Sequence, residues 1–303
     1  MENPFRSGVV AVIGRPNVGK SSLINKILDY KLSIVSAKPQ TTRDNILGLY
    51  NSDSAQILFV DTPGIHKPLN KLGEKLVERA VSEIDEADII LFVITIDDSP
   101  TQGQNARIIR FLSENPSTPV VLAVNKVDMP GAKGKILAVI DQFTKALKIA
   151  EVMPVSARQG INIQELTVLL ETMLPEAPPL YPDDMLTDRS ERFITQEIIR
   201  EKIISLTQEE VPHSVAVEIE EYKSPDEYPE RKDLFIRATI YVNRPGQKNI
   251  ILGKKGEKIK IIGIEARKTI EEITGHKVFL ELWVKVNNGW IDSESELKKL
   301  GYE

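Results

Sequence analysis

The chain has 303 residues, of which 41% are hydrophobic and 27% are charged, a composition typical of a globular protein with about two domains. It contains no cysteine, which excludes disulfides, thiolate zinc sites and cysteine catalysis. Its formal net charge of −5 argues against nucleic-acid binding over the whole surface, so any such binding must be local.

The first predicted element is a strand at residues 9–13, which leads directly into Gly-Arg-Pro-Asn-Val-Gly-Lys-Ser and then into a helical sequence. This is the phosphate-loop pattern, in which glycines let several backbone N–H groups point at a phosphate chain. Lys20 is expected to reach the β- and γ-phosphates, and the Ser21 hydroxyl to bind Mg²⁺. The residues predicted to surround the phosphates are Gly14, Arg15, Pro16, Asn17, Val18, Gly19, Lys20, Ser21 and Ser22.

A second strand is predicted at residues 57–60, and Asp61-Thr62-Pro63-Gly64 follows it. We expect Asp61 to hold Mg²⁺ through a water molecule and the Gly64 N–H to sense the γ-phosphate. Many GTPases place a glutamine after this glycine to orient the attacking water. Ile65 stands there in this chain and cannot do so, which predicts that hydrolysis is slow or depends on another group.

Two later strands carry the motifs that select the base. Residues 120–124 lead into Asn125-Lys126-Val127-Asp128, and residues 152–155 lead into Ser156-Ala157-Arg158. The Asp128 carboxylate can accept from both guanine N1–H and the 2-amino group, a pair of donors that adenine lacks. Asn125 and Lys126 would frame the base, and the backbone N–H groups of Ser156, Ala157 and Arg158 would meet guanine O6. Together the motifs predict GTP bound at the carboxyl ends of the strands.

This set of motifs, with Thr41-Thr42-Arg43-Asp44, resembles the TrmE–Era–EngA branch of the translation-factor-related GTPases. The resemblance implies that Thr42 binds Mg²⁺, although the same residues also suit an ordinary polar loop. It also implies a K⁺ ion at Asn17, because TrmE holds K⁺ with an asparagine at the matching position. Asn17 is equally suited to shaping the loop. The catalytic residues implied are Asn17, Lys20, Thr42 and Gly64.

The order of elements predicts an α/β phosphate-loop GTPase domain with a mostly parallel sheet. Strands alternate with helical sequences at residues 70–85, 104–114, 133–147 and 163–173. Four prolines between residues 174 and 184 then favour an extended, semi-rigid linker. The predicted division is a GTPase domain at residues 1–174, a linker at 175–187 and a second, α+β domain at 188–303.

The second domain is predicted to contain a helix at residues 191–210, strands at 215–220 and 234–242, helical sequence around Gly253-Lys254-Lys255-Gly256 and through residue 274, and a strand at 278–286. This order, with its Gly-x-x-Gly loop, resembles the type II KH module, which clamps single-stranded RNA. The alternative is a helix-turn-helix whose glycines only make the turn. Clustered basic residues favour RNA. The residues predicted to bind it are Arg244, Lys248, Ile251, Gly253, Lys254, Lys255, Gly256, Lys258, Lys260 and Arg267.

A GTPase domain followed by a type II KH domain resembles the Era family of KH-domain GTPases, which act in small ribosomal subunit assembly. The resemblance covers nearly the whole chain. It implies GTP and GDP as ligands, binding to the 3′ end of 16S rRNA, action on the 30S subunit as a monomer, and a peripheral association with the inner membrane. The sequence shows no signal peptide and no membrane anchor, so we expect a cytoplasmic protein.

Two other readings stay open at this point. One is a slow regulatory switch that needs a separate activating protein, which Ile65 favours. The other takes the second domain as a protein-docking module. Metal binding by histidine is not expected, because His66, His213 and His276 lie far apart in the sequence.

Overall fold

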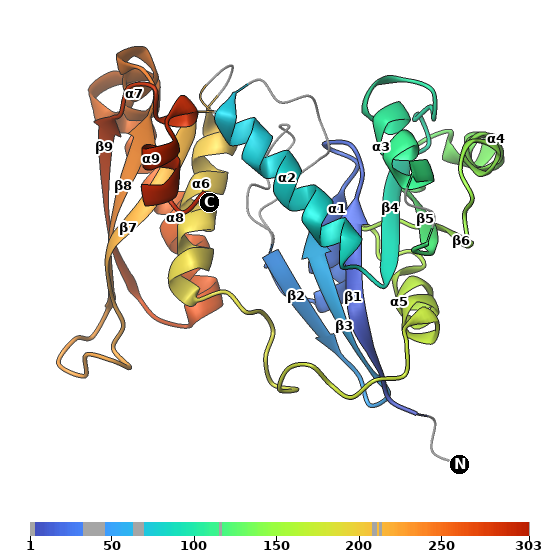
Figure 1. The fold of residues 1–303 in the computed structure, drawn as a ribbon. Helices are drawn as coiled ribbons and strands as arrows, with labels where there is room; N and C mark the ends of the chain where they lie inside the picture. The colour runs from blue at the N-terminus through green and yellow to red at the C-terminus, as the bar shows by residue number, and fades with distance from the viewer. Residues whose placement is uncertain are drawn as a thin grey trace. The chain divides into compact units, whose positions relative to one another are not determined.

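The computed structural model describes residues 4–32, 46–62, 70–114, 117–207, 211 and 214–302. The chain forms two compact units, and the main division between them falls after Asp188 (Figure 1). Among the described residues, no helix is long and apolar enough to cross a membrane.

The first unit is built on a six-stranded sheet in the order β2-β3-β1-β4-β5-β6, in which only the β2–β3 pair is antiparallel. Figure 1 shows helices on both faces of this sheet. The strands are β1 Arg6–Ile13, β2 Ile46–Asn51, β3 Ala55–Asp61, β4 Ile89–Thr95, β5 Val120–Asn125 and β6 Glu151–Pro154. The helices are α1 Lys20–Leu28, α2 Lys71–Asp85, α3 Gly103–Glu114, α4 Ala132–Ala146 and α5 Ile163–Met173.

The core of the first unit lies on both faces of the sheet, because successive residues of its inner strands point to opposite sides and are apolar on both. One cluster joins side chains of α1 and α5 to alternate residues of the strands, and the other joins those of α3, α4 and the end of α2 to the remaining residues. Burial on both faces explains why these strands read as continuous apolar runs in the sequence.

The proline-rich segment packs along the first unit. The Gln56 side chain, 1% exposed, accepts hydrogen bonds from the backbone N–H groups of Leu180 (2.7 Å) and Tyr181 (2.9 Å). The N–H of Leu49, on the outer strand β2, donates to the carbonyl of Leu186 at 3.0 Å. The prolines therefore do not leave this segment free in solvent: its backbone hydrogen-bonds to β2 and β3.

The second unit is a three-stranded sheet in the order β7-β8-β9, with β7–β8 antiparallel and β8–β9 parallel. Helices α6 and α8 pack against each other, α6 also against β7 and α8 against β9. The elements are α6 Glu191–Leu206, β7 Val215–Lys223, β8 Leu234–Val242, α7 Pro245–Leu252, the 3₁₀ turn η2 Lys254–Gly256, α8 Glu257–Thr274, β9 Val278–Val286, the 3₁₀ turn η3 Trp290–Asp292 and α9 Glu294–Lys299.

The predicted fold class is confirmed; several strand bounds differ from the predicted ones by one to three residues, and three larger differences stand out. Helix α6 ends at Leu206 instead of residue 210, because Thr207 adopts an extended backbone while its hydroxyl bonds the Ile203 carbonyl at 2.6 Å. Strand β2 and helix α9 were not expected: the sequence of β2 is short and interrupted by Gly48, and α9 has only six residues.

Candidate nucleotide site and nucleic-acid groove

The phosphate loop lies between β1 and α1, and its backbone has the conformations that the glycine pattern predicts. Gly14 and Gly19 have φ of 150° and 100°. A Cβ on Gly14 would stand 2.3 Å from the Val93 carbonyl oxygen, and one on Gly19 would stand 2.4 Å from the Asn125 side-chain nitrogen, so neither position has room for a side chain. Asn17 adopts a left-handed conformation with φ of 65°.

Lys20 and Ser21 begin α1, and both are held in place by neighbouring polar groups. The Lys20 ammonium donates to the Gly14 carbonyl at 3.0 Å across the loop. Burial lowers the pKa of Lys20 below its ordinary value, and the nearby Asp61 carboxylate opposes this shift. The Ser21 hydroxyl donates to Asp61 Oδ2 at 2.6 Å, which joins the start of α1 to the end of β3.

Asn125 connects three of the predicted motifs. Its side-chain amide donates to the carbonyl of Val18 in the phosphate loop at 2.8 Å. Its side-chain oxygen accepts from the N–H of Lys126 at 2.8 Å and from that of Ala157 at 3.1 Å. One buried amide therefore fixes the phosphate loop, the end of β5 and the end of β6 in a common position.

The residues predicted to recognise the base lie on the same edge of the sheet. Asp128 Oδ1 accepts a hydrogen bond from the Ser156 hydroxyl at 2.7 Å, which orients the carboxylate. The Lys126 ammonium reaches back to the Asn17 carbonyl at 2.6 Å, and Lys126 itself is left-handed with φ of 64°. Arg158 is exposed beyond this cluster.

Arg15 departs from the simple expectation of a phosphate-facing side chain. Its guanidinium forms an ion pair with Asp98, in the turn after β4, and also donates to the Thr95 hydroxyl at 3.4 Å. A hollow of about 540 Å³ opens beside this pair and is lined by Arg15, Pro16, Asn17 and residues of the turn between β4 and α3. The sequence analysis missed Asp98, although its place after an apolar strand marks it.

Several predicted residues lie outside the described residues, namely Thr42, Gly64 and Ile65. Among those described, no group of three or more His, Cys, Asp or Glu residues could hold a metal ion.

The Gly-x-x-Gly loop of the second unit lies between α7 and α8, as predicted. Gly253 and Gly256 have φ of 70° and 81°, and a Cβ on Gly253 would stand 2.6 Å from the Cβ of Lys258. Lys255 is also left-handed, with φ of 52°. This backbone turns the Lys254 and Lys255 side chains outward, and both are exposed.

The other predicted RNA-contacting residues differ in accessibility. Arg244, Lys260 and Arg267 are exposed, whereas Lys248 and Lys258 are half-buried. Ile251 is fully buried in the second unit, which corrects the expectation that its side chain is available to a ligand. It lies on the inner face of α7, where an apolar side chain stabilises the helix that carries the loop.

A groove of about 360 Å³ runs beside the basic residues, between α8 and β9. Sequence reasoning missed its apolar members, which come from β9 and from α8. The helix lies against the strand at Gly263, where a Cβ would stand 3.6 Å from Leu282, an ordinary contact distance. The lining residues are Ile259, Lys260, Gly263, Ile264, Arg267, Val278, Phe279, Leu280 and Leu282.

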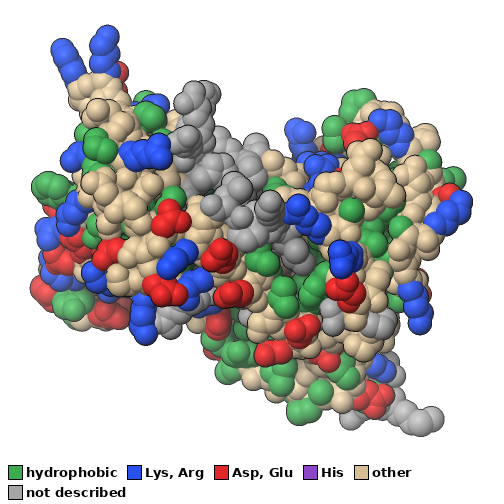
Figure 2. Space-filling model, turned by 45° about the horizontal axis from the view of Figure 1, so that its top comes forward, with side chains coloured by type: hydrophobic (Ala, Val, Ile, Leu, Met, Phe, Trp, Pro, Cys, Tyr) green, Lys and Arg blue, Asp and Glu red, His purple; other side chains and the backbone are tan. Residues whose placement is uncertain are grey.

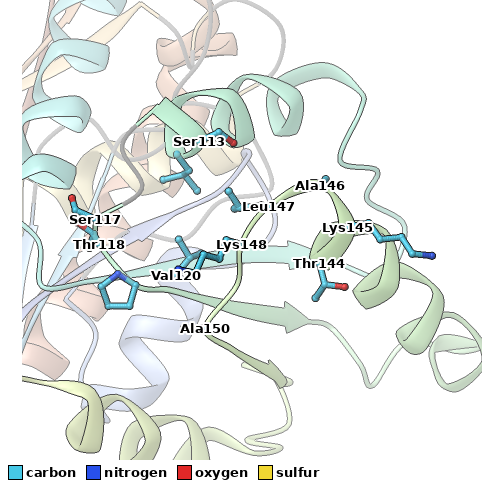
Figure 3. Close-up of a pocket in the computed structure, with 12 residues that line it drawn as sticks. Ser113, Ser117, Thr118, Val120, Thr144, Lys145, Ala146, Leu147, Lys148 and Ala150 are labelled. Atoms are coloured by element: carbon cyan, nitrogen blue, oxygen red, sulfur yellow. The ribbon is translucent and has the colours of Figure 1, made fainter.

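The surface around these sites is otherwise mixed in charge. On the face drawn in Figure 2, basic and acidic side chains are interspersed. Another hollow of about 510 Å³ lies in the first unit, at the ends of α3 and α4 and the start of β5, and holds none of the predicted residues (Figure 3). The predicted ligand-binding residues therefore lie at the phosphate loop and around the groove beside the Gly-x-x-Gly loop.

Two family models match the chain. Residues 9–126 match the 50S ribosome-binding GTPase family, and residues 210–291 match the KH domain family. The GTPase Era of Leuconostoc citreum (strain KM20) is 48% identical over 302 residues, which cover 99% of this chain and 98% of the relative. The GTPase Era of Geotalea uraniireducens (strain Rf4) is 46% identical over 304 residues, covering 100% and 99%.

Two solved structures are similar over nearly the whole length. One is of an Aquifex aeolicus Era variant bound to GDP and AlF₄⁻, and the other is of Era with MgGDPNP and nucleotides 1506–1542 of 16S ribosomal RNA. Each has a TM-score of 0.92 and 42% sequence identity, and each match covers 98% of this chain and 99% of the other.

Proposed function

Because the chain belongs to the Era family of GTPases, we propose that it uses GTP hydrolysis in its first unit to time the binding of 16S rRNA by its second unit. The observation that carries this proposal is the position of Asn125, whose side chain joins the phosphate loop to both base-recognition motifs. The second unit supplies a Gly-x-x-Gly loop with two exposed lysines, beside a groove.

The proposed nucleotide-binding residues of the first unit form two groups, one that binds the phosphates and one that binds the guanine base. The loop from Gly14 to Ser22 cradles the phosphates with the backbone N–H groups of its residues other than Pro16, and Lys20 neutralises their charge. Asp128 accepts from guanine, with its carboxylate already oriented by Ser156. Asn125 and Lys126 hold the loop against the base-recognition motifs. The N–H groups of Ser156 and Ala157 donate to the Ile161 carbonyl and to Asn125 Oδ1, so we propose that of Arg158 alone for guanine O6.

The residues present fit a magnesium ion. Ser21 Oγ and Asp61 Oδ2 lie 2.6 Å apart, and a hydroxyl with a carboxylate oxygen is the hard oxygen set that Mg²⁺ takes with phosphates and water. Thr42 would complete the protein ligands and Gly64 would contact the γ-phosphate. When bound, Mg²⁺ neutralises charge that develops on the phosphate oxygens. Asp61 would act mainly through a bound water.

The group that assists hydrolysis is a separate part of the proposal. Ile65 cannot orient water, so we propose that a K⁺ ion near Asn17 supplies positive charge beside the phosphates. Asn17 suits this role because its backbone is left-handed and its carbonyl is fixed by Lys126. The alternative is a slow switch that depends on an external activator.

The RNA-binding part rests on local charge. Exposed basic residues surround the Gly-x-x-Gly loop in a chain whose net charge is −5, and the adjacent groove has apolar walls suited to unstacked bases. We propose that this surface binds the 3′ end of 16S rRNA during 30S subunit maturation, with the chain acting as a monomer in the cytoplasm.

The proposed domains are residues 1–174, the segment 175–187 and residues 188–303. Peripheral contact with the inner membrane stays a prediction.

Multiple-turnover GTP hydrolysis tests the proposal. Lys20→Ala should abolish nucleotide binding or turnover while leaving the fold intact, because the ammonium serves phosphates and not the core. Lys145→Ala, an exposed lysine paired with Asp141 on α4, is the matched control and should behave as wild type. Wild-type turnover in Lys20→Ala would refute the assigned site.

The same assay in KCl and in NaCl tests the cation. We expect K⁺ to stimulate the wild type and Asn17→Ala to lose that stimulation, whereas Ile65→Ala should change turnover far less than the roughly 10³-fold loss of a principal transition-state group. An absence of cation preference in the wild type would discard K⁺ and favour the activator-dependent switch.

A further inference from the structure

Asp98 is the most strongly fixed carboxylate next to the phosphate loop that the nucleotide chemistry does not use. Its side chain is 3% exposed. Oδ2 accepts from the backbone N–H of Thr95 at 2.6 Å and from the Thr95 hydroxyl at 2.9 Å, while Oδ1 accepts from the Asn105 side chain at 3.0 Å. These contacts bind the carboxylate to the end of β4 and to the first turn of α3.

The remaining partner of this carboxylate is Arg15, the second residue of the phosphate loop. A buried carboxylate needs an opposite charge nearby, because its desolvation is otherwise uncompensated. Arg15 supplies that charge and is 41% exposed, so its guanidinium keeps contact with water on one side. The pair therefore joins a side chain of the phosphate loop to the turn after β4, whose carboxylate is itself bonded to Thr95 and Asn105.

Two contacts of this kind hold the residues on either side of Pro16, in addition to the hydrogen bonds that Asn125 and Lys20 make with the loop. Arg15 is held by Asp98, and the Asn17 carbonyl is held by the Lys126 ammonium at 2.6 Å. Asn17 keeps a left-handed backbone, a conformation that asparagine adopts more readily than most non-glycine residues. A loop fixed in this way before its ligand arrives loses less conformational entropy on binding.

We propose that Asp98 is a positioning residue for nucleotide binding: through Arg15 it holds the phosphate loop in the conformation that receives the phosphates of guanine nucleotides. This inference rests on the proposed nucleotide site. Because the loop cradles the phosphates that GDP and GTP share, losing the anchor weakens both nucleotides by the same factor. Turnover at saturating GTP stays near the wild-type value, since bound phosphates themselves then order the loop.

The experiment measures dissociation constants for GDP and for a non-hydrolysable GTP analogue, with turnover at saturating GTP and the thermal midpoint of the nucleotide-free full chain. Asp98→Asn and Arg15→Gln should each weaken both nucleotides by about tenfold, because each removes the ion pair that holds the loop side chain. Turnover at saturating GTP should stay within about twofold in Asp98→Asn. The double variant should bind no more weakly than the weaker single variant, because both remove one interaction.

Asp97→Asn is the matched control. Asp97 is the neighbouring residue, its side chain is 55% exposed, and it pairs with exposed Lys135 at 2.6 Å, so its replacement should leave both affinities unchanged. Arg15→Lys, which keeps the charge, should recover part of the affinity lost in Arg15→Gln.

Three outcomes would overturn the inference. Wild-type nucleotide affinity in Arg15→Gln would do so, even if Asp98→Asn lowered the thermal midpoint, because Asp98 would then be merely structural. Additive losses in the double variant would show that the two residues act separately, and a loss confined to the GTP analogue would place the effect at the γ-phosphate. Lys20→Ala distinguishes a failure of the proposed nucleotide site from a failure of the Asp98 inference alone. If it binds and hydrolyses GTP like the wild type, the site itself is misassigned; if it does not and Asp98→Asn binds both nucleotides with wild-type affinity, only this inference fails.

Discussion

At the scale of single residues, the site depends on side chains that orient one another before a ligand binds. Asp128 shows this most clearly. Its carboxylate would rotate freely at the end of a loop, but the Ser156 hydroxyl at 2.7 Å fixes one oxygen. Ser156 in turn accepts from the N–H of Gln159 at 3.0 Å, so the chain after β6 sets the direction of a group that follows β5.

Replacing Asp128 by asparagine should change the base that the protein accepts. Hydrogen bonds from guanine to a carboxylate are worth about 1.5–3 kcal/mol each, so Asp128→Asn should cost at least about tenfold in GTP affinity. The new amide could donate to the 2-oxo group of xanthine, so xanthosine triphosphate should bind more tightly than it does to the wild type. Competition binding measures both changes.

Asp141→Asn, an exposed carboxylate paired with Lys145 on α4, controls for the lost charge. Unchanged GTP affinity in Asp128→Asn, with no gain for the xanthine nucleotide, would show that another group reads the base.

At the scale of elements, the loop between α7 and α8 should act as an electrostatic clamp. Lys254 and Lys255 are exposed on a left-handed turn that both glycines permit. Replacing both lysines by aspartate should make the slope of log K against log salt shallower by roughly 1.4, at ~0.7 per single-strand phosphate contact. Titration of a short single-stranded RNA at several salt concentrations gives this slope.

GTP turnover without RNA should not change in that variant. The matched control is the aspartate variant of Lys298 and Lys299, which lie on α9 and away from the loop in sequence. If the salt slope of the loop variant equalled that of the wild type, the phosphates would have to be bound elsewhere, and the protein-docking reading of the second unit would gain support.

Gln56 should hold the proline-rich segment against the first unit. Its side-chain oxygen accepts from the N–H groups of Leu180 and Tyr181, and its amide donates to the Tyr181 carbonyl at 2.9 Å. Each of these bonds is worth about 1 kcal/mol. In Gln56→Ala the amides of Leu180 and Tyr181 should therefore exchange with solvent roughly tenfold faster or more.

Hydrogen exchange followed by mass spectrometry or NMR measures this release. Amides of the β4–β5 ladder should keep their rates, and Gln142→Ala, an exposed glutamine on α4, should leave the segment protected. Equal protection of Leu180 and Tyr181 in the wild type and in Gln56→Ala would mean that neighbouring contacts, such as that between Leu49 and Leu186, hold the segment by themselves.

At the scale of the whole molecule, the two activities should be linked energetically. If a non-hydrolysable GTP analogue changes RNA affinity relative to GDP by some factor, RNA must change the ratio of analogue to GDP affinity by the same factor. Such coupling is typically ~1–3 kcal/mol, or roughly five- to 150-fold. RNA is titrated into the protein bound to GDP and into the protein bound to the analogue, and each nucleotide is titrated with and without RNA. The two sets of titrations measure the coupling factor independently. Equal RNA affinities in the two forms would mean that the units are only tethered.

The sequence by itself determined the family, the fold class and most of the elements, because each rests on short-range patterns. A phosphate loop needs glycines at fixed spacing, a strand buried on both faces reads as a continuous apolar run, and β8 and β9 have the bounds that their alternation predicts. The same patterns located the motifs that follow β1, β3, β5 and β6, since parallel strands bring their carboxyl ends to one edge.

Only the tertiary structure decided how the side chains pair. Arg15 and Asp98 stand 83 positions apart in the sequence, and no spacing rule links them; they meet because β4 pairs directly with β1. Ile251 has the apolar character of a groove residue, yet the rotation of α7 turns it into the core. In the sequence, Gln56 is an ordinary polar strand residue. Its role depends on the proline-rich segment, which packs back along β2 and β3. Hydrogen bonds and ion pairs depend on distances of about 3 Å between atoms of distant segments, and only the packed chain fixes such distances.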